Sequence, residues 1–303
     1  MIFDLENVLN KKIITKNALN VEVHLKREDT IHPIISGNKY RKLKYNLKEA
    51  KEQNKNTVVT FGGAYSNHIA AVAAAGKVYG FKTIGVIRGE EIKDKLERNA
   101  TLKYAKSCGM IFKFISRLEF RNKNEFYFIE NLKNEFGDFY NIPEGGTNAL
   151  AIKGCEEILT QDDFKFNYVC TPVGTGGTVA GIINSTKPNQ QVLGFSALKG
   201  DFLREDISKF AKQDNWKLIT NYHFGGYAKI NEELITFINT FKAINNIQLD
   251  PVYTGKMLFG IQDLIEKKYF PEGSKILAIH TGGLQGIQGM NERLKQKGLP
   301  IIK

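Results

Sequence analysis

Short runs of apolar and β-branched residues alternate along the chain with longer segments of helical spacing. The apolar runs resemble buried strands and occur at residues 57–61, 83–89, 110–115, 138–143, 168–173, 192–198 and 275–280. Helical segments follow near residues 67–79, 94–107, 123–136 and 178–185, another helical pattern runs through Lys51 after residues 36–43, and a helix closes the chain. This alternation predicts right-handed βαβ crossovers and mostly parallel sheets. The predicted fold class is therefore α/β.

Four glycine-rich loops come directly after apolar runs, at residues 62–63, 145–146, 174–177 and 282–283. Each loop taken singly has a structural explanation, because glycine supplies a positive φ in a turn. Parallel sheets, however, place their sites beyond the carboxyl ends of the strands, in the loops that lead into helices. Four such loops at one edge predict a ligand that the backbone approaches closely.

One of these loops has the chemistry of a phosphate site. Its backbone N–H groups and the start of the next helix would cradle an anion without a basic side chain. No Lys-Ser/Thr follows the glycines, as a Walker A loop requires, and Val179 replaces the third glycine of the dinucleotide fingerprint. The loop therefore favours a lone phosphate monoester, and it indicates pyridoxal phosphate (PLP) as the cofactor, with a purely structural turn as the alternative. Its residues are Gly174, Thr175, Gly176, Gly177 and Thr178.

Lys39 differs from the other lysines of its basic segment. Gly37 and Asn38 place it on a turn at the entrance to a helix, whereas Lys42, Lys44 and Lys48 are expected to be solvated. An amine must be neutral to form a Schiff base, and at a pKa near 10.4 on the order of one lysine in 10³ is neutral at pH 7. Burial would therefore have to lower the pKa of Lys39.

Ser66 opens an alanine-rich helix after the glycine pair at residues 62–63. As an N-cap it has a structural explanation. The functional alternative is that exposed N–H groups at this helix start hold a substrate carboxylate, while the Ser66 hydroxyl moves a proton. Asn67 would hydrogen-bond a cofactor oxygen. Both explanations of Ser66 stay open at this point.

The formal net charge is +11, from 43 Lys and Arg against 32 Asp and Glu. The basic residues are scattered, and lysine outnumbers arginine, which is the residue expected at phosphate and base contacts. We therefore expect a solvated lysine-rich surface and no nucleic-acid partner.

Cysteine, histidine and apolar content exclude other classes of site. The 3 cysteines (Cys108, Cys155 and Cys170) form no CxxC pair and are expected to be buried reduced thiols, and the 5 histidines show no metal-ligand spacing. The most apolar stretch, residues 69–76, is far shorter than the roughly 20 residues that span a bilayer. With Asp4 and Glu6 near the N-terminus, we expect no metal, no membrane partner and a cytoplasmic location.

Several motifs occur together in one order: GNKYRKL (37–43), GGAYSNH (62–68), IPEGGTNALAIKG (142–154), GTGGT (174–178), DPVYTGK (250–256) and FPEGSKILAIHTGG (270–283). They resemble the fold-type-II PLP enzymes of the 1-aminocyclopropane-1-carboxylate (ACC) deaminase/D-cysteine desulfhydrase family. The resemblance spans about residues 20–290.

The resemblance implies two open parallel-sheet domains with PLP in the cleft between them. Residues 1–41 and 152–303 would form the large PLP-binding domain, and residues 42–151 the inserted small domain. Family members are usually homodimers. For the cofactor, the motifs imply that Lys39 is the Schiff-base lysine, that Asn67 contacts the PLP ring hydroxyl and that residues 174–178 hold the phosphate. For the substrate, they imply contacts from Tyr65, Ser66, Asn67 and His68. They also identify Tyr227 and Tyr253 with the two active-site tyrosines of the family.

Two threonines separate this chain from the ACC deaminases. Thr254 stands where those enzymes have a glutamate facing the pyridine nitrogen, and Thr281 where they have a leucine; both, with His68, resemble the desulfhydrase side. A neutral hydroxyl stabilises a protonated pyridinium less than a carboxylate does, which favours β-elimination of a good leaving group over the opening of a cyclopropane. Tyr65 replaces a glutamine expected in both branches and alters the substrate pocket.

The resemblance thus implies a PLP-dependent lyase of a small amino acid, with D-cysteine as the predicted substrate and pyruvate, sulfide and ammonia as products. Lys39, once free, would remove the α-proton, and Tyr253 and Tyr227 would orient the substrate or protonate the leaving sulfur. The alternatives are ACC deamination to 2-oxobutyrate and ammonia, and a PLP-binding protein without robust turnover.

Overall fold

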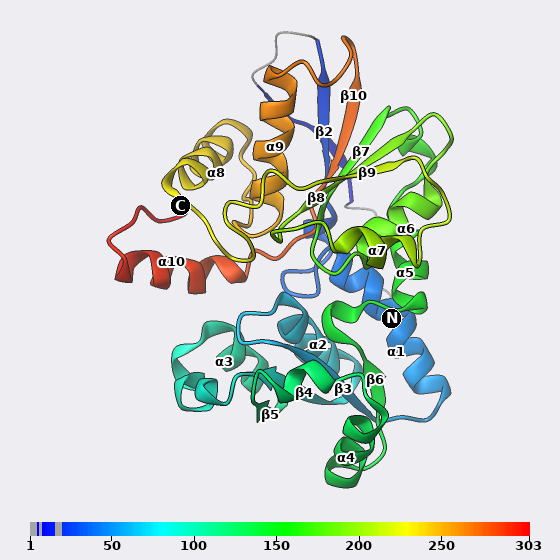
Figure 1. Cartoon of the computed structure of the whole chain (residues 1–303), viewed down its shortest axis with the longest axis vertical. Helices are drawn as coiled ribbons and strands as arrows, with labels where there is room; N and C mark the ends of the chain where they lie inside the picture. Colours follow the sequence, from blue (N-terminus) through cyan, green and yellow to red (C-terminus); the bar gives the residue numbers. More distant parts are fainter. Residues whose placement is uncertain (1–4, 6–7, 16–19) are drawn as a thin grey trace.

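The computed structural model describes residue 5 and residues 8–15 and 20–303, and it has two sheets (Figure 1). The larger sheet has six strands in the order β1-β2-β10-β7-β8-β9, and the smaller has four in the order β5-β4-β3-β6. Every strand pair is parallel except β1 with β2. The predicted α/β class and the mostly parallel pairing are confirmed.

The large sheet is built from both ends of the described chain, and the small sheet from the stretch between them. The large sheet contains β1 (Asn10–Lys12), β2 (Glu22–Lys26), β7 (Tyr168–Val173), β8 (Gln191–Ser196), β9 (Trp216–Ile219) and β10 (Lys275–Ile279). The small sheet contains β3 (Thr57–Gly63), β4 (Lys82–Arg88), β5 (Ile111–Ile115) and β6 (Tyr140–Ile142). The domain limits at residues 42 and 151 stay a prediction.

Helices cover both faces of each sheet (Figure 1). On the large sheet, α8 (Glu232–Asn245), α9 (Thr254–Glu266) and α10 (Gly286–Gln296) lie on one side, and α5 (Ala149–Cys155), α6 (Gly177–Ser185) and α7 (Leu203–Ser208) on the other. On the small sheet, α1 (Asn38–Glu52), α2 (Asn67–Tyr79) and α3 (Ala100–Ser107) pack against one face and α4 (Phe126–Phe136) against the other.

The strands alternate their side chains between these two layers. In β10, Ile276 and Ala278 join the core under α8 and α9, whereas Leu277 and Ile279 join the core under α6. All four side chains are buried, which explains why central parallel strands read as continuous apolar runs in the sequence. No helix among the described residues is long and apolar enough to cross a membrane.

Two predicted helices are shorter than expected. The segment predicted at 94–107 begins as a 3-10 helix, Glu90–Arg98, and the α-helix starts after Asn99, whose side chain accepts a hydrogen bond from Leu102 N. The segment predicted at 123–136 becomes helical at Phe126. In both cases, local turns occupy the first residues of an amphipathic stretch.

Candidate active site

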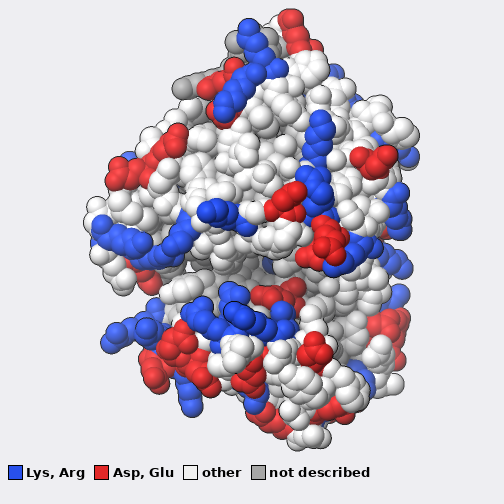
Figure 2. Space-filling view, in the orientation of Figure 1, with Lys and Arg blue, Asp and Glu red and all other residues white. Residues whose placement is uncertain are grey.

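The carboxyl-terminal ends of strands from both sheets open onto one cavity of about 730 Å³. On the surface it opens into the groove between the upper and lower parts of the molecule (Figure 2). The predicted site residues that line it are Lys39, Tyr65, Ser66, Asn67, His68, Gly174, Thr175, Gly176, Thr178, Tyr227, Tyr253 and Thr281. Gly177 and Thr254 are buried and are not part of the lining.

Lys39 lies in the first turn of α1 and lines this cavity. Burial lowers its pKa to about 7, and the nearby charge of Lys42 acts in the same direction. About half of the Lys39 amines would therefore be neutral at pH 7, as the formation of a Schiff base requires. Gly37, just before the helix, has a φ of 55°, and a Cβ there would lie 2.2 Å from Thr281 O, so glycine lets α1 begin directly against Thr281.

Lys42 is buried, with 2% of its surface exposed, so the expectation that it is solvated was wrong. Its Nζ donates hydrogen bonds to Gly145 O (2.9 Å), Thr147 Oγ1 (3.1 Å) and Thr175 Oγ1 (3.4 Å). Lys42 thus brings an amine to the predicted phosphate loop. Its position three residues after Lys39, on the same helix face, is the sequence signal that could have revealed this. Lys44 is half-buried beside Glu157, and Lys48 is exposed as expected.

The loop at residues 174–178 has the geometry of an anion site. Gly176 has a φ of 82° and precedes α6, whose first-turn N–H groups have no partner within the helix. The Thr178 hydroxyl accepts a hydrogen bond from Asn38 Nδ2 (2.9 Å), which ties the loop to the start of α1. The loop, Lys42 and Lys39 therefore belong to one region.

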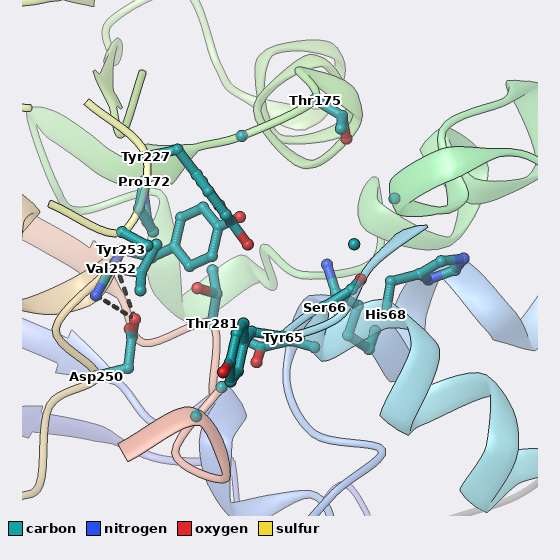
Figure 3. A pocket seen from close by; sticks show the side chains of 18 of the residues that line it. Tyr65, Ser66, His68, Pro172, Thr175, Tyr227, Asp250, Val252, Tyr253 and Thr281 are labelled. Carbon is teal, nitrogen blue, oxygen red and sulfur yellow. Dashed lines mark hydrogen bonds between the residues drawn. The ribbon is translucent and has the colours of Figure 1, made fainter. Parts of the chain in front are cut away.

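Ser66 is the N-cap of α2, as predicted, and its hydroxyl accepts a hydrogen bond from Ile69 N (3.4 Å). Asn67 lies next to the loop that follows β10, because a Cβ on Gly283 would lie 2.6 Å from Asn67 Nδ2. Tyr65 is 58% exposed. Figure 3 shows Tyr65 and Thr281 at the cavity, with Ser66 and His68 on the α2 side.

His68 is neutral, and its tautomer follows from its neighbours. Thr60 Oγ1 lies 2.8 Å from His68 Nε2 and donates its single hydrogen to Ile142 O (2.9 Å), so His68 Nε2 carries a proton. Burial, with the charges of Lys39 and Lys42, lowers the pKa of His68 well below 6.5. Its Nδ1 is a buried acceptor without a partner among the described residues. Such an acceptor suits a hydrogen-bond donor better than the predicted substrate carboxylate.

Tyr227 and Tyr253 form a pair on the opposite side of the cavity (Figure 3). Their ring centroids are 6.2 Å apart in an edge-on arrangement. Burial raises the pKa of Tyr227 and raises that of Tyr253 well above 10. Both hydroxyls are therefore protonated at neutral pH and can donate a proton or a hydrogen bond.

Asp250 is a cavity residue that the sequence reasoning missed. Its buried carboxylate accepts hydrogen bonds from the backbone N–H groups of Val252 (2.9 Å), Tyr253 (2.8 Å) and Thr254 (2.8 Å). The Thr254 hydroxyl also donates to it (2.6 Å) and is therefore committed to Asp250. An aspartate a few residues before a helix is a recognisable cap signal, which could have pointed to it. Asp250 fixes Tyr253 at the start of α9.

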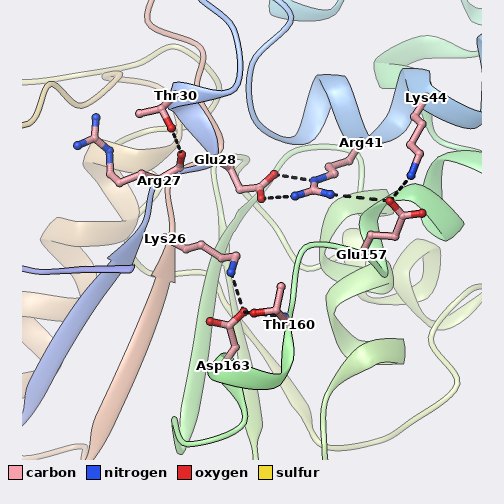
Figure 4. Close-up of polar contacts among 9 residues, drawn as sticks. All are labelled: Lys26, Arg27, Glu28, Thr30, Arg41, Lys44, Glu157, Thr160 and Asp163. Atoms are coloured by element: carbon pink, nitrogen blue, oxygen red, sulfur yellow. Dashed lines mark hydrogen bonds and ion pairs between the residues drawn. The ribbon is translucent and has the colours of Figure 1, made fainter. Parts of the chain in front are cut away.

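Charged side chains join α1 to neighbouring segments (Figure 4). Arg41, on α1, pairs with the carboxylate of Glu28 and approaches Glu157 at 3.8 Å. Lys44 also pairs with Glu157 (2.5 Å). These pairs hold α1 against the turn after β2 and against the segment after α5. Cys155 and Cys170 are buried free thiols as expected, whereas Cys108 is half-buried.

Comparison with known proteins places this site in a family. The family described as "Pyridoxal-phosphate dependent enzyme" matches residues 14–282. The chain belongs to the PLP-dependent enzymes. This match confirms the predicted cofactor and, together with the relatives named next, the predicted family and fold type.

Relatives of this PLP-dependent enzyme carry the names ACC deaminase and D-cysteine desulfhydrase. It is 31% identical to a putative ACC deaminase of Pyrococcus horikoshii, over 91% of this chain and 89% of the relative. It is also 31% identical to a bifunctional D-cysteine desulfhydrase/ACC deaminase of Arabidopsis thaliana, a mitochondrial protein, over 88% of this chain and 73% of the relative. A solved structure of an ACC deaminase homologue has a TM-score of 0.81 and 28% identity, covering 98% of this chain and 96% of the other.

The residues of this PLP-dependent enzyme fit the cofactor. The loop at 174–178 and Lys42 suit its phosphate, and Lys39 suits its aldehyde. Two buried acceptors that line the cavity, His68 Nδ1 and Gln285 Oε1, lack partners among the described residues, which indicates room for a polar ligand. The individual roles assigned to the site residues stay predictions.

Proposed function

We propose that this PLP-dependent enzyme is a lyase that releases ammonia from a small amino acid by β-elimination, with D-cysteine as substrate and pyruvate, sulfide and ammonia as products. The observation that carries the proposal is the Lys39 amine with a pKa of about 7, in a cavity that also holds two protonated tyrosines. PLP, when bound, supplies an electron sink for charge that develops at Cα.

The chain's own residues supply the acid and base. Neutral Lys39 accepts the proton from Cα, because its amine is uncharged over much of the neutral pH range. The N–H groups at the start of α2, next to Ser66, hold the substrate carboxylate. Tyr253, fixed by Asp250, donates a proton to the leaving sulfur, with the ring of Tyr227 packed against it.

ACC deamination to 2-oxobutyrate and ammonia is the second candidate, favoured by the names of the relatives. The threonines favour the first candidate. Thr281 presents a neutral side chain to the cavity, and the Thr254 hydroxyl is engaged with Asp250, so neither supplies a carboxylate to a pyridine nitrogen. Asp250 itself caps α9 through three backbone amides.

A substrate panel on the PLP-loaded protein separates the candidates. We expect sulfide and pyruvate from D-cysteine, pyruvate from β-chloro-D-alanine, and little 2-oxobutyrate from ACC, with L-cysteine reporting stereochemistry. Lys39→Ala should abolish both product formation and the visible absorbance of bound PLP, whereas Lys48→Ala, an exposed lysine on the same helix, should keep both. Bound PLP without product from any of these amino acids would overturn the proposed function.

Assembly as a homodimer, which the resemblance implies, is part of the same proposal. Sedimentation equilibrium of the PLP-loaded protein should give twice the chain mass of 34.2 kDa. A monomer at micromolar concentration would contradict it.

A further inference from the structure

Several charged side chains that line the cavity are already engaged with a neighbour. Among the acidic ones, Glu144 pairs with Lys123 (3.3 Å) and Asp206 with Lys209 (2.8 Å), and Asp250 is occupied by backbone amides. Among the basic ones, Arg117 pairs with Glu91 (2.7 Å).

Two lining arginines, Arg88 and Arg293, have no carboxylate partner among the residues that the structure describes. Lys39 and Lys42 are assigned to PLP by the proposed function, so these arginines supply the positive charge that remains in the cavity. Basic side chains also gather along the rim of the groove below the large sheet (Figure 2).

Arg88 is placed next to the substrate position by the small sheet. It is the last residue of β4 and pairs in register with Gly63 of β3, the strand that leads to Ser66. Its Nη2 lies 3.6 Å from the position of a Cβ on Gly63, so the guanidinium is beside the loop that opens α2. Its charge also acts on the hydroxyl of Tyr227 across the cavity. The ring of Phe120, 5.6 Å from the guanidinium carbon, supports it.

We propose that the site takes amino acids whose side chain carries an anionic group, and that Arg88 binds that group. The inference rests on the proposed function and deepens it. A guanidinium beside the carboxylate-binding loop and near the tyrosine pair lies where the side chain of a bound amino acid would extend. The thiolate form of cysteine is the smallest member of this substrate class, and phosphate esters and sulfonates are larger members. ACC, whose ring carries no charge, gains no binding energy from Arg88.

The chemistry of the elimination is consistent with this class. The Cα–H bond breaks with its proton passing to Lys39, and the bond from Cβ to the leaving group breaks with its electron pair going to that group. The 2-aminoacrylate released then takes up water to give pyruvate and ammonia. Because the electron pair goes to the leaving group, negative charge builds up there as the bond breaks. Arg88 stabilises that charge, and for sulfur Tyr253 then supplies a proton.

Binding is tested without turnover by a matched pair of ligands. Aspartate and asparagine have nearly the same shape and no leaving group, so calorimetric titration of the PLP-loaded protein with each, in both enantiomers, isolates the side-chain charge. We expect aspartate to bind about 10- to 100-fold more tightly, as for a hydrogen bond to a charged group. Arg88→Gln should remove this preference, Arg88→Lys should keep part of it, and Arg121→Gln, a nearby arginine outside the lining, should leave it unchanged.

Turnover gives the second test. It compares pyruvate formation from O-phosphoserine and from neutral β-chloroalanine, each used as the enantiomer that the enzyme converts. In Arg88→Gln, kcat/KM should fall about 10- to 100-fold for O-phosphoserine and little for β-chloroalanine. An equal loss for both substrates would assign Arg88 to the α-carboxylate and overturn the inference, as would no loss for either. If no substrate turns over, the proposed function fails, whereas the calorimetric preference still decides the inference.

Discussion

The guanidinium of Arg41 donates two hydrogen bonds, of 2.9 and 2.7 Å, to the carboxylate of Glu28, and both side chains are buried. Arg41 lies two residues after Lys39 on α1, and Glu28 belongs to the 3-10 turn that follows β2. The pair therefore anchors the helix that carries Lys39 to the carboxyl end of β2 in the large sheet. Because a buried charge needs a partner, each member of the pair depends on the other.

Glu28→Gln should lower the free energy of unfolding by about 3–5 kcal/mol, because it leaves the Arg41 charge buried without its carboxylate. Denaturant unfolding of the protein measures this. Glu52→Gln, which removes a carboxylate from an exposed ion pair with Lys48 on the same helix, is the control and should stay close to the original stability. Equal stability of both variants would contradict an anchoring role for Glu28.

Attachment of PLP to the protein should depend on pH with a midpoint at about pH 7. Lys39 has a pKa lowered to about 7, so its amine is protonated and unreactive below that pH and neutral above it. The rate at which visible absorbance appears after PLP is mixed with the cofactor-free protein should therefore rise as pH rises through 7 and then level off. A rate that still climbs steeply between pH 8 and 10 would show an unperturbed lysine.

Lys42→Gln should move that midpoint to higher pH. The positive charge of Lys42 contributes to lowering the pKa of Lys39, and its removal lets that pKa rise. The variant should also bind PLP more weakly, by about 10-fold, because an amine beside the phosphate loop is lost. Lys44→Gln, on the same helix but paired with Glu157, serves as the comparison and should change neither the midpoint nor the affinity.

Tyr253→Phe should reduce kcat for D-cysteine by about 10²- to 10⁴-fold, because the protonated phenol that neutralises the leaving sulfur is gone. β-Chloro-D-alanine should be much less affected, since chloride leaves without a proton. Pyruvate release from the two substrates measures the difference. Similar losses for both would show that Tyr253 positions the substrate and does not donate a proton.

Gly37→Ala should destabilise the protein more than Gly80→Ala. Both glycines have a positive φ, 55° and 76°, but a Cβ at position 37 would lie 2.2 Å from Thr281 O whereas one at position 80 meets nothing within 4 Å. The cost at position 80 is therefore limited to backbone strain of about 1 kcal/mol. Thermal unfolding of the two variants compares the costs, and a similar loss for both would mean that α1 shifts freely away from Thr281.

The sequence predicts seven of the described strands well and misses β1, β2 and β9 of the large sheet. Strands β3, β7 and β10 are buried on both faces, so they appear as apolar runs that any reader of the sequence can find. In β2, buried Val23 and Leu25 alternate with polar Glu22 and His24 over five residues, too short a pattern to stand out. Helix α8 was not predicted from the alternation of apolar runs, although its buried residues recur at helical spacing: Leu234, Ile235, Ile238 and Phe241.

In the candidate site, residues whose role depends on local structure could be predicted, and residues whose role depends on distant partners could not. Lys39, Ser66 and the glycine loop could be identified because their chemistry depends on local turns and helix starts. For Lys42, its spacing from Lys39 indicates a shared helix face, but its partners Thr147 and Thr175 come from segments more than one hundred residues away and could not be identified. Asp250 and Arg88 likewise acquire meaning from the residues that surround them in space.

The position of β10 between β2 and β7 has a consequence for biosynthesis. The segment that carries Lys39 and the loop that suits phosphate belong to halves of the large sheet that only this late strand joins. Both the Lys39 segment and the loop at 174–178 leave the exit tunnel of the ribosome well before residues 275–279 do. The nascent chain can therefore complete its small sheet early, but it acquires a vitamin B6 pocket only after β10 has been made.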